Sequence, residues 1–274
     1  MSKHIVGKNT PHKIRRLLAD IETCPTVGFF WGAGFGLNIQ HENIIKERRI
    51  ICIVYKWEGE KKVTVLQWDK NQDDKAMLVE FAKVANEADE IVGHYGNHFD
   101  WPWIRTRMLF HKLPPVPVWK TVDTKAIASK YFYFQSNKLD YISNFLGHGR
   151  KLHTDFQLWI DVMNGSEKAL RYMCKYCARD VTRLEHVFHD MQPFVPVRSH
   201  AGVLGGRDKW TCPRDGSKHV KTNKKKVTAH GTVQWQMQCL ACGSYYTISQ
   251  TAHADYLAYQ KEQKERAEKK VAKK

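Results

Sequence analysis

The sequence predicts an α/β domain built around a mixed sheet, followed by a small β-rich module that carries metal-binding cysteines. Three predicted strands are followed by a helix, a strand, a helix, another extended segment and more helices. This order is typical of a mixed sheet flanked by helices. Beyond residue 195 the composition changes to short polar β-like stretches between two cysteine motifs. A chain of 274 residues is long enough for one substantial domain and one small one.

Three strands open the α/β domain. Residues 15–23, with the sequence RRLLADIET, form the first strand. Residues 48–68 contain two more strands, joined by a short turn at Glu58–Gly59–Glu60. Together these segments predict a three-stranded antiparallel meander. Residues 90–95, with the sequence EIVGHY, predict one more short buried strand.

Helices make up most of the remaining domain. Apolar side chains recur at helical spacing in residues 73–89, and residues 100–113 form a second helix whose first turn tolerates Pro102. A long helix begins after Ser166, a favourable N-cap residue, and ends at about Met191 before two prolines. A proline-rich extended stretch is expected at residues 114–124, and two short helices at 124–132 and 139–146. Residues 148–165 are expected to be irregular.

We expect five segments along the chain. The α/β domain occupies residues 14–195, after an N-terminal arm at 1–13 and before a linker at 196–208. The β-rich module follows at 209–250. The last segment, 251–274, is a basic helix or tail.

The charge of the chain predicts a polyanionic partner. The formal net charge is +16, and residues 207–274 alone carry 15 Lys and Arg against 6 Asp and Glu. Nucleic acid is the first candidate for such a partner. The sequence contains no apolar run of about 18 residues. Its N-terminus lacks the apolar stretch of a secretory signal, so we expect a cytoplasmic protein with no membrane partner.

Two acids at the end of the first strand raise the question of a metal site. Asp20 and Glu22 are two residues apart, so their side chains leave the strand on the same face. Two like charges side by side repel each other unless a cation lies between them. The alternative is a strand edge at which both acids reach water.

Further acids lie where other elements begin or end. Asp100 follows a glycine-containing turn, and Asp180 lies one helical turn after Tyr176 on the same face of the long helix. The motifs DIE, GHYGNHFD and YCARD, in this order, resemble the DEDDy branch of the DEDD (DnaQ-like) superfamily of 3′–5′ exonucleases. That branch includes the proofreading domains of family-B DNA polymerases. The segment KLDYISNFLG also resembles a segment of the branch, and the resemblance covers residues of about 14–195.

The resemblance implies a ribonuclease H-like fold that binds two Mg²⁺ or Mn²⁺ ions. In this fold, Asp20 is expected to bridge both ions. Glu22 and Asp180 are expected to complete the coordination of the ion that holds the attacking water. Asp100 is expected to support the second ion, and Tyr176 to orient the water. The four acids and the tyrosine are therefore the candidate catalytic residues.

The implied reaction is hydrolysis of single-stranded DNA, or of a frayed 3′ end, with release of nucleoside 5′-monophosphates in replication or repair. The implied partner is a DNA polymerase or another replication protein, in a bacterial cell or a phage-infected host. Three alternatives stay open: an exoribonuclease, a structure-selective endonuclease, and a catalytically inactive nucleic-acid-binding accessory protein.

Thr23 and Tyr95 are the candidate substrate contacts. The family often has Asn where Tyr95 stands, which puts the substrate preference in question. Tyr95, Phe99, Trp101 and Trp103 either stack on bases or fill the core, and for Phe99 and Trp103 core packing is favoured.

The C-terminal module resembles a zinc ribbon. The motifs CPRDG and CLACG share the form C-x-x-ligand-Gly of a tight metal-binding knuckle. They supply Cys212, Cys239 and Cys242 as ligands for Zn²⁺. Asp215 stands where a fourth cysteine is expected and is favoured over His219, and a ribbon without metal is the remaining alternative. The uneven spread of seven cysteines fits a reducing compartment with a metal site better than a disulfide framework.

Overall fold

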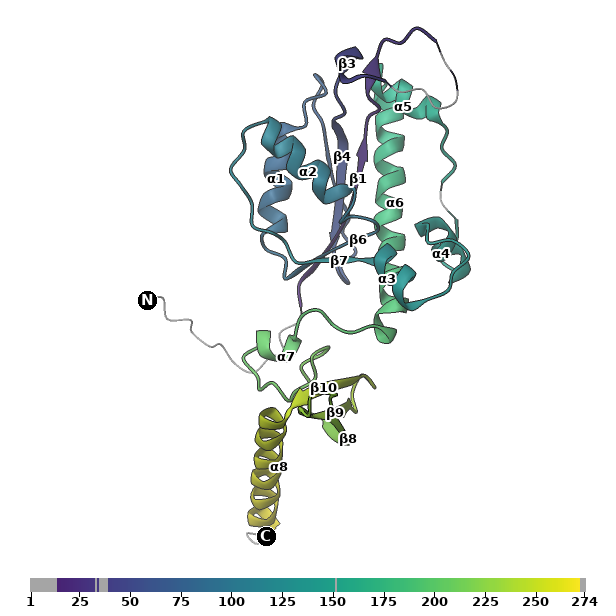
Figure 1. The fold of residues 1–274 in the computed structure, drawn as a ribbon. Coiled ribbons are helices and arrows are strands. Elements are labelled where there is room, and N and C mark those ends of the chain that lie inside the picture. The colour runs from purple at the N-terminus through teal and green to yellow at the C-terminus, as the bar shows by residue number, and fades with distance from the viewer. Residues whose placement is uncertain (1–13, 33, 35–38, 151, 272–274) are drawn as a thin grey trace. The chain divides into compact units, whose positions relative to one another are not determined.

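The structure is a computed structural model that describes residues 14–32, 34, 39–150 and 152–271, so the predicted N-terminal arm lies outside the described residues. The chain separates into two units, one from Arg15 to Val195 and one that includes everything from Pro196 onward (Figure 1). Among the described helices, none has the length and apolar character needed to cross a bilayer.

A five-stranded mixed sheet forms the centre of the first unit and confirms the predicted fold class. The strand order is β5-β4-β1-β6-β7, with β1 in the middle. β1 pairs antiparallel with β4, which comes from the predicted meander, and parallel with β6, which follows a helix. The strands span Arg16–Thr23 (β1), Ile50–Trp57 (β4), Thr64–Gln67 (β5), Glu90–Gly93 (β6) and Thr121–Asp123 (β7).

Helices cover both faces of this sheet, with α1 and α2 on one side and α3 to α6 on the other (Figure 1). The longest helix, α6, is amphipathic, and it packs its buried side chains on β1 and β4. Ser166 caps it as predicted, because its Oγ accepts a hydrogen bond from the Ala169 amide at 3.2 Å. The helices span Lys75–Ala85 (α1), Asp100–Phe110 (α2), Thr124–Tyr131 (α3), Leu139–Phe145 (α4), Phe156–Met163 (α5) and Glu167–Met191 (α6).

Several short elements differ from the prediction. The stretch expected to be irregular contains α5, which begins where the Asp155 carboxylate accepts a hydrogen bond from the Leu158 amide at 3.3 Å. The segment predicted as a linker contains the single helical turn α7. Elements this short hold too few residues to show a hydrophobic period. They are β2 (Val27–Gly28), a 3₁₀ turn (His41–Asn43), β3 (Ile44–Lys46), a second 3₁₀ turn (Gln192–Phe194) and α7 (Ala201–Leu204).

The second unit is a three-stranded antiparallel sheet followed by one long helix. Its strand order is β10-β9-β8, and its small core includes Trp210, Met237 and Tyr256. The ring of His253 on the helix stacks on Trp235 of β9, with ring centroids 3.9 Å apart, so the start of the helix is fixed to the sheet. The elements span Val220–Val227 (β8), Val233–Cys239 (β9), Tyr245–Ser249 (β10) and Gln250–Val271 (α8).

One buried acid ties α1, α2 and β4 together in the first unit. Asp74, immediately before α1, is fully buried and accepts hydrogen bonds from Arg107 Nε at 2.7 Å and from the Ile50 amide at 3.0 Å. His111 Nε2 lies 2.6 Å from the same carboxylate. Burial alone would raise the pKa of Asp74, but these partners, Arg107 first among them, hold that pKa below its usual value.

We therefore expect Asp74→Asn to lower the free energy of unfolding by about 3–5 kcal/mol at pH 7, because it leaves the buried Arg107 without its counter-charge. The folded-state pKa of Asp74 is lowered, so its stabilising effect is present above the unfolded pKa of about 3.9 and is lost as the pH falls through the folded value. Urea unfolding between pH 7 and pH 3 measures this, and the difference between wild type and variant should shrink in acid. Asp73→Asn, at the exposed neighbouring acid, is the matched control; an equal loss in both variants would contradict the assignment.

Candidate functional site

The end of β1 presents two acids to one side of the sheet. Asp20 and Glu22 are half-buried, while Ile21 between them is buried, as expected where side chains alternate along a strand. In the register of the sheet, Asp20 lies opposite Val54 and Glu22 opposite Cys52 of β4, so the backbone of both acids is fixed by ladder hydrogen bonds. The side chains of Asp20 and Glu22 therefore share one face of β1, as the alternation along a strand predicts.

Asp100, the first residue of α2, reaches the same place from the other side of β1. Its Oδ1 accepts a hydrogen bond from the Ile21 amide at 3.0 Å, and the residue is 2% exposed. Burial, together with the nearby Asp20 carboxylate, raises the pKa of Asp100 well above its ordinary value. The site therefore disfavours having all its carboxylates charged, and a bound cation would remove that penalty.

The turn before α2 is built on two glycines. A Cβ at Gly96 would come within 2.8 Å of the Trp101 ring, and one at Gly93 within 2.9 Å, so each glycine leaves room for the indole beneath the turn. Trp101 is 2% exposed and belongs to the core, which excludes it as a base-stacking residue. Phe99 and Trp103 are partly buried and pack against the same core, and Phe99 also lines the cavity described below.

α6 brings Asp180 to the acids of β1. Asp180 is buried, and Arg183, one turn later, lies 3.4 Å from its Oδ1. Cys177, on the same helix, places its Sγ 3.4 Å from Asp20 Oδ2. Burial raises the pKa of the Cys177 thiol, so the thiol stays protonated and donates to the carboxylate. Tyr176 lies one turn before Asp180 and is also buried.

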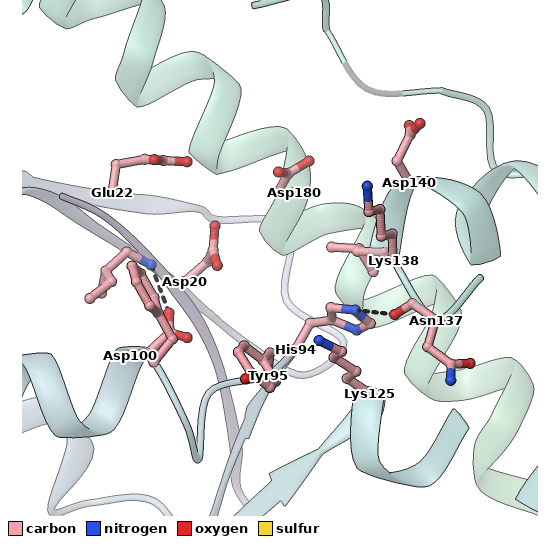
Figure 2. A pocket seen from close by; sticks show the side chains of 13 residues that line it. Asp20, Glu22, His94, Tyr95, Asp100, Lys125, Asn137, Lys138, Asp140 and Asp180 are labelled. Atoms are coloured by element: carbon pink, nitrogen blue, oxygen red, sulfur yellow. Dashed lines mark hydrogen bonds between the residues drawn. The ribbon is translucent and has the colours of Figure 1, made fainter. Parts of the chain in front are cut away.

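These elements enclose a cavity of about 380 Å³, inside the range of about 300–1,000 Å³ for small-molecule sites. Figure 2 shows the acids from β1, α2 and α6 on one side of it, and side chains from α3 and the region of α4 on the other. The predicted residues that line it are Asp20, Glu22, Tyr95, Asp100 and Asp180, with Asp140 as a further acid. Tyr176 is not among the lining residues. Thr23 lines a different cavity beside Cys24, Arg48 and Trp159.

The wall opposite the acids is polar and carries both charges. Lys125, Lys138 and His94 line it, together with Leu139 and Asp140 of α4. His94 Nδ1 lies 2.9 Å from Thr124 Oγ1, and its Nε2 lies 3.0 Å from the Asn137 carbonyl oxygen, so the imidazole joins the turn, α3 and the segment before α4. A divalent ion on the acids and cations on the facing wall would leave space between them for a phosphate.

Tyr95 is held in an unusual backbone conformation at the mouth of this cavity. Its φ is +69°, in the left-handed region that non-glycine residues rarely occupy, and its side chain is 42% exposed. The buried Asp123 carboxylate holds it there, because Oδ1 accepts from the Tyr95 amide at 3.0 Å and Oδ2 accepts from the Asn97 amide at 3.2 Å. Lys125 Nζ lies 3.6 Å from the centroid of the Tyr95 ring.

Four contacts of this site were not predicted. Asp123, Lys125 and Arg183 lie outside the motifs that predicted the site, and Cys177 lies inside the motif YCARD without an assigned role. Asp123 stands directly before a helical pattern, and an acid in that position is typical of an N-cap. In the structure, Asp123 Oδ1 accepts a hydrogen bond from the Lys125 amide at 3.0 Å. The signals for Cys177 and Arg183 were their helical spacing of three from Asp180.

The cysteine motifs of the second unit also converge. One ligand atom from each of Cys212, Asp215, Cys239 and Cys242 lies within 4.8 Å of the others. Cys212 Sγ is 3.6 Å from Cys242 Sγ, and Cys239 Sγ is 3.5 Å from Asp215 Oδ2. Among the residues that the structure describes, His219 is not part of this group. Three thiols and one carboxylate at such distances fit a tetrahedral zinc ion.

The two knuckles share one backbone design, because the Gly216 amide donates to the Cys212 carbonyl oxygen at 2.8 Å and the Gly243 amide donates to the Cys239 carbonyl oxygen at 3.0 Å. In addition, the Arg214 amide donates to Cys212 Sγ at 3.4 Å, and the Cys242 amide donates to Cys239 Sγ at 3.5 Å. Each knuckle ends in a glycine with positive φ, +69° at Gly216 and +75° at Gly243. Amide donors aimed at the sulfurs would stabilise thiolates, which are the form that binds metal.

The comparison with family models identifies the family. The RNase H superfamily model matches residues 38–192, more than half of the chain, and the chain therefore belongs to this superfamily. The matched segment contains Asp100 and Asp180 and begins after β1. A search of curated proteins gives no match.

Solved structures give the same fold. The chain is similar to a family B DNA polymerase from the hyperthermophilic archaeon Pyrobaculum calidifontis, with a TM-score of 0.53 and 15% sequence identity. The match covers 81% of this chain and 32% of the polymerase chain, so this chain spans about a third of the length of that protein. At this identity the similarity establishes the fold. Family and fold together support a nuclease.

Proposed function

We propose that the protein is a metal-dependent 3′–5′ exonuclease that removes nucleoside 5′-monophosphates from single-stranded DNA or frayed 3′ ends. The observation that carries the proposal is the convergence of Asp20, Glu22, Asp100 and Asp180 on one cavity, from three separate elements of an RNase H-like fold. Four acids on one cavity, with Asp100 and Asp180 buried, are costly unless cations neutralise them. The chain's excess of positive charge agrees with a polyanionic substrate.

The acids fit two Mg²⁺ or Mn²⁺ ions, which prefer carboxylate oxygens. Such ions, when bound, activate a water and stabilise the charge on the phosphate and the leaving oxygen. Asp20, Glu22, Asp100 and Asp180 would hold these ions, with Asp20 shared between them, Glu22 and Asp180 serving the ion that activates the water, and Asp100 serving the other. Asp100 is kept in place by the Ile21 amide, so its orientation is fixed before substrate arrives.

The residues of the facing wall would bind the substrate. Lys125 and Lys138 face the acids across the cavity and supply positive charge to the phosphates on either side of the scissile bond. Tyr95, exposed at the mouth and fixed by Asp123, offers a ring on which the terminal base stacks. Tyr176, one helical turn before Asp180, would orient the attacking water. Thr23 lies outside this cavity, so we assign it no contact with the terminal nucleotide.

The test compares 5′-labelled single-stranded DNA with RNA of the same sequence, each with Mg²⁺, with Mn²⁺ or with chelator. A ladder that shortens from the 3′ end in the presence of metal supports the proposal, and its presence on DNA or RNA decides the sugar. Cleavage of a substrate whose 3′ end is blocked would instead indicate a structure-selective endonuclease. Binding without any cleavage would indicate a nucleic-acid-binding accessory protein.

The second unit would bind one Zn²⁺ ion through Cys212, Asp215, Cys239 and Cys242. The distances among these four side chains and the matched knuckles support this ligand set. The ion would serve structure, because all four positions are filled by protein and none is left for a substrate. A replication protein such as a DNA polymerase is the partner that agrees with this pairing of a nuclease with a small basic module.

A further inference from the structure

The sheet of the second unit has one polar outward face on which three lysines are aligned. Residues directly opposite each other in antiparallel strands share a face. In the register of the sheet, Gln238, Gln236 and Gln234 of β9 stand between lysines of β8 on one side and residues of β10 on the other. The three rows that result are Lys221–Gln238–Tyr245, Lys224–Gln236–Thr247 and Lys226–Gln234–Ser249.

A β-bulge creates this alignment. Side chains alternate along a regular strand, so Lys221 would share its face with Asn223 and Lys225 rather than with Lys224 and Lys226. The register of β8 shifts between Thr222 and Lys224, and this shift returns the later lysines to the face of Lys221. Asn223, the extra residue, also donates from its side chain to Gln236 Oε1 at 2.7 Å.

The opposite face of the sheet is committed to the core. Met237 and Ile248 are buried there, and Thr222 Oγ1 lies 2.9 Å from His253 Nε2 of α8. The outward face is therefore the side of the sheet that α8 does not cover. Its side chains are accessible: the three lysines are exposed, and Tyr245 is 56% exposed.

The charge on this face has one sign. The strands β8, β9 and β10 contain no Asp or Glu. Within the described part of the chain, Lys221, Lys224 and Lys226 take part in no ion pair. Neighbouring rows are two residues apart along β9, so the lysines follow one line at intervals of about 7 Å.

We propose that this face binds single-stranded DNA. A line of unpaired lysines is complementary to a phosphate backbone, and the glutamine amides beside it can both donate to and accept from base edges. The exposed Tyr245 ring provides a stacking surface for an unpaired base. In a duplex the bases stack on one another, so this surface favours a single strand. The choice of DNA over RNA rests on the proposed function. The face would hold the strand outside the nuclease cavity and slow its release.

The test measures binding of a labelled 20-nucleotide single strand to the full-length chain by fluorescence anisotropy at several salt concentrations, with no Mg²⁺ or Mn²⁺ added. Each lysine that contacts a phosphate in a single strand contributes about 0.7 to the slope of log Kd against log salt. The variant with Lys221, Lys224 and Lys226 all changed to Gln should therefore lose about 2 from this slope, and its Kd at 0.1 M salt should rise roughly tenfold or more. Tyr245→Ala should raise Kd about tenfold with the slope unchanged.

The matched control removes the same charge elsewhere: Lys261, Lys264 and Lys269, all exposed on α8, are changed to Gln. If the two triple variants show the same Kd and slope, the proposal is overturned, and an acidic protein becomes the candidate partner of the face. Tighter lysine-dependent binding of the matching RNA would overturn the choice of DNA. Binding is measured without added metal and therefore without cleavage. The binding result can thus be interpreted even if the nuclease assay fails. Cleavage of a trinucleotide by the wild-type chain and by the triple variant of β8 reports the nuclease site separately.

Discussion

Asp20→Asn should reduce the turnover of a single-stranded DNA substrate by a factor of about 1,000 or more, a loss of about 4 kcal/mol in transition-state stabilisation. The substitution keeps the size and shape of the side chain, and it removes the charge from the one acid that we place between both ions. The Cys177 thiol, which donates to Asp20 Oδ2 at 3.4 Å, would then face a neutral amide instead of a carboxylate. Because Asp20 raises the pKa of Asp100, the variant should also make Asp100 easier to ionise.

Two measurements separate chemistry from folding in this variant. Single-turnover cleavage with saturating Mn²⁺ gives the rate, and thermal unfolding in the absence of metal gives the stability. Relief of repulsion among the acids should leave the metal-free variant at least as stable as the wild type. Glu80→Gln, on the exposed face of α1, removes one acid from the same unit and should cleave normally. Near-normal cleavage by Asp20→Asn would refute the assignment of the site.

Removal of zinc should unfold the second unit and leave the first one folded. The core of the second unit has few buried side chains, and two of them are the proposed ligands Cys212 and Cys239. So small a core buries little apolar surface, and in such modules the binding of structural zinc supplies much of the folding free energy. Zinc binding to such modules contributes an apparent free energy on the order of 10–16 kcal/mol at pH 7. Purified protein should therefore contain one zinc per chain.

Hydrogen exchange followed by mass spectrometry checks this for each segment. Chelation, or Cys239→Ser, should abolish the protection of β8, β9 and β10 while the protection of β1, β4 and α6 is retained. Asp215→Cys should keep the zinc, because it completes a set of four thiolates. His219→Ala should keep it as well, since His219 is not part of the converging group. Loss of zinc from His219→Ala, or a chain isolated without zinc and still protected in β8 to β10, would contradict the ligand set.

The placement of four acids around one cavity could be predicted from the order of the motifs and from local geometry. Asp20 and Glu22 share a face through the two-residue period of a strand, and Asp180 and Tyr176 share one through the helical period. The position of Asp100 followed from its place after a turn. The mixed sheet followed from the order of strands and helices.

The contacts that fix Tyr95 depend on tertiary pairing instead. Asp123 reaches the Tyr95 amide because β6 and β7 are neighbours, with Gly93 opposite Asp123 in the register. Neither segment specifies the other in a single sequence. Trp101 and Trp103 are equally aromatic and two residues apart, and only the close approach of Gly93 and Gly96 shows which indole lies under the turn. Thr23 lines a different cavity, because the alternation along a strand puts it on the face opposite to Asp20 and Glu22.

The alternation along β1 also links activity to correct assembly of the whole sheet. Leu17, Ala19 and Ile21 are buried on one face of β1, while Asp20 and Glu22 open into the cavity on the other. A shift of one residue in the pairing with β4 would exchange the two sets, so both acids would enter an apolar layer and the cavity would lose its ligands. A misassembled sheet is thus both unstable and inactive. The specific activity of a preparation should accordingly be proportional to its fraction of correctly folded molecules. No population of chains with intermediate activity is expected.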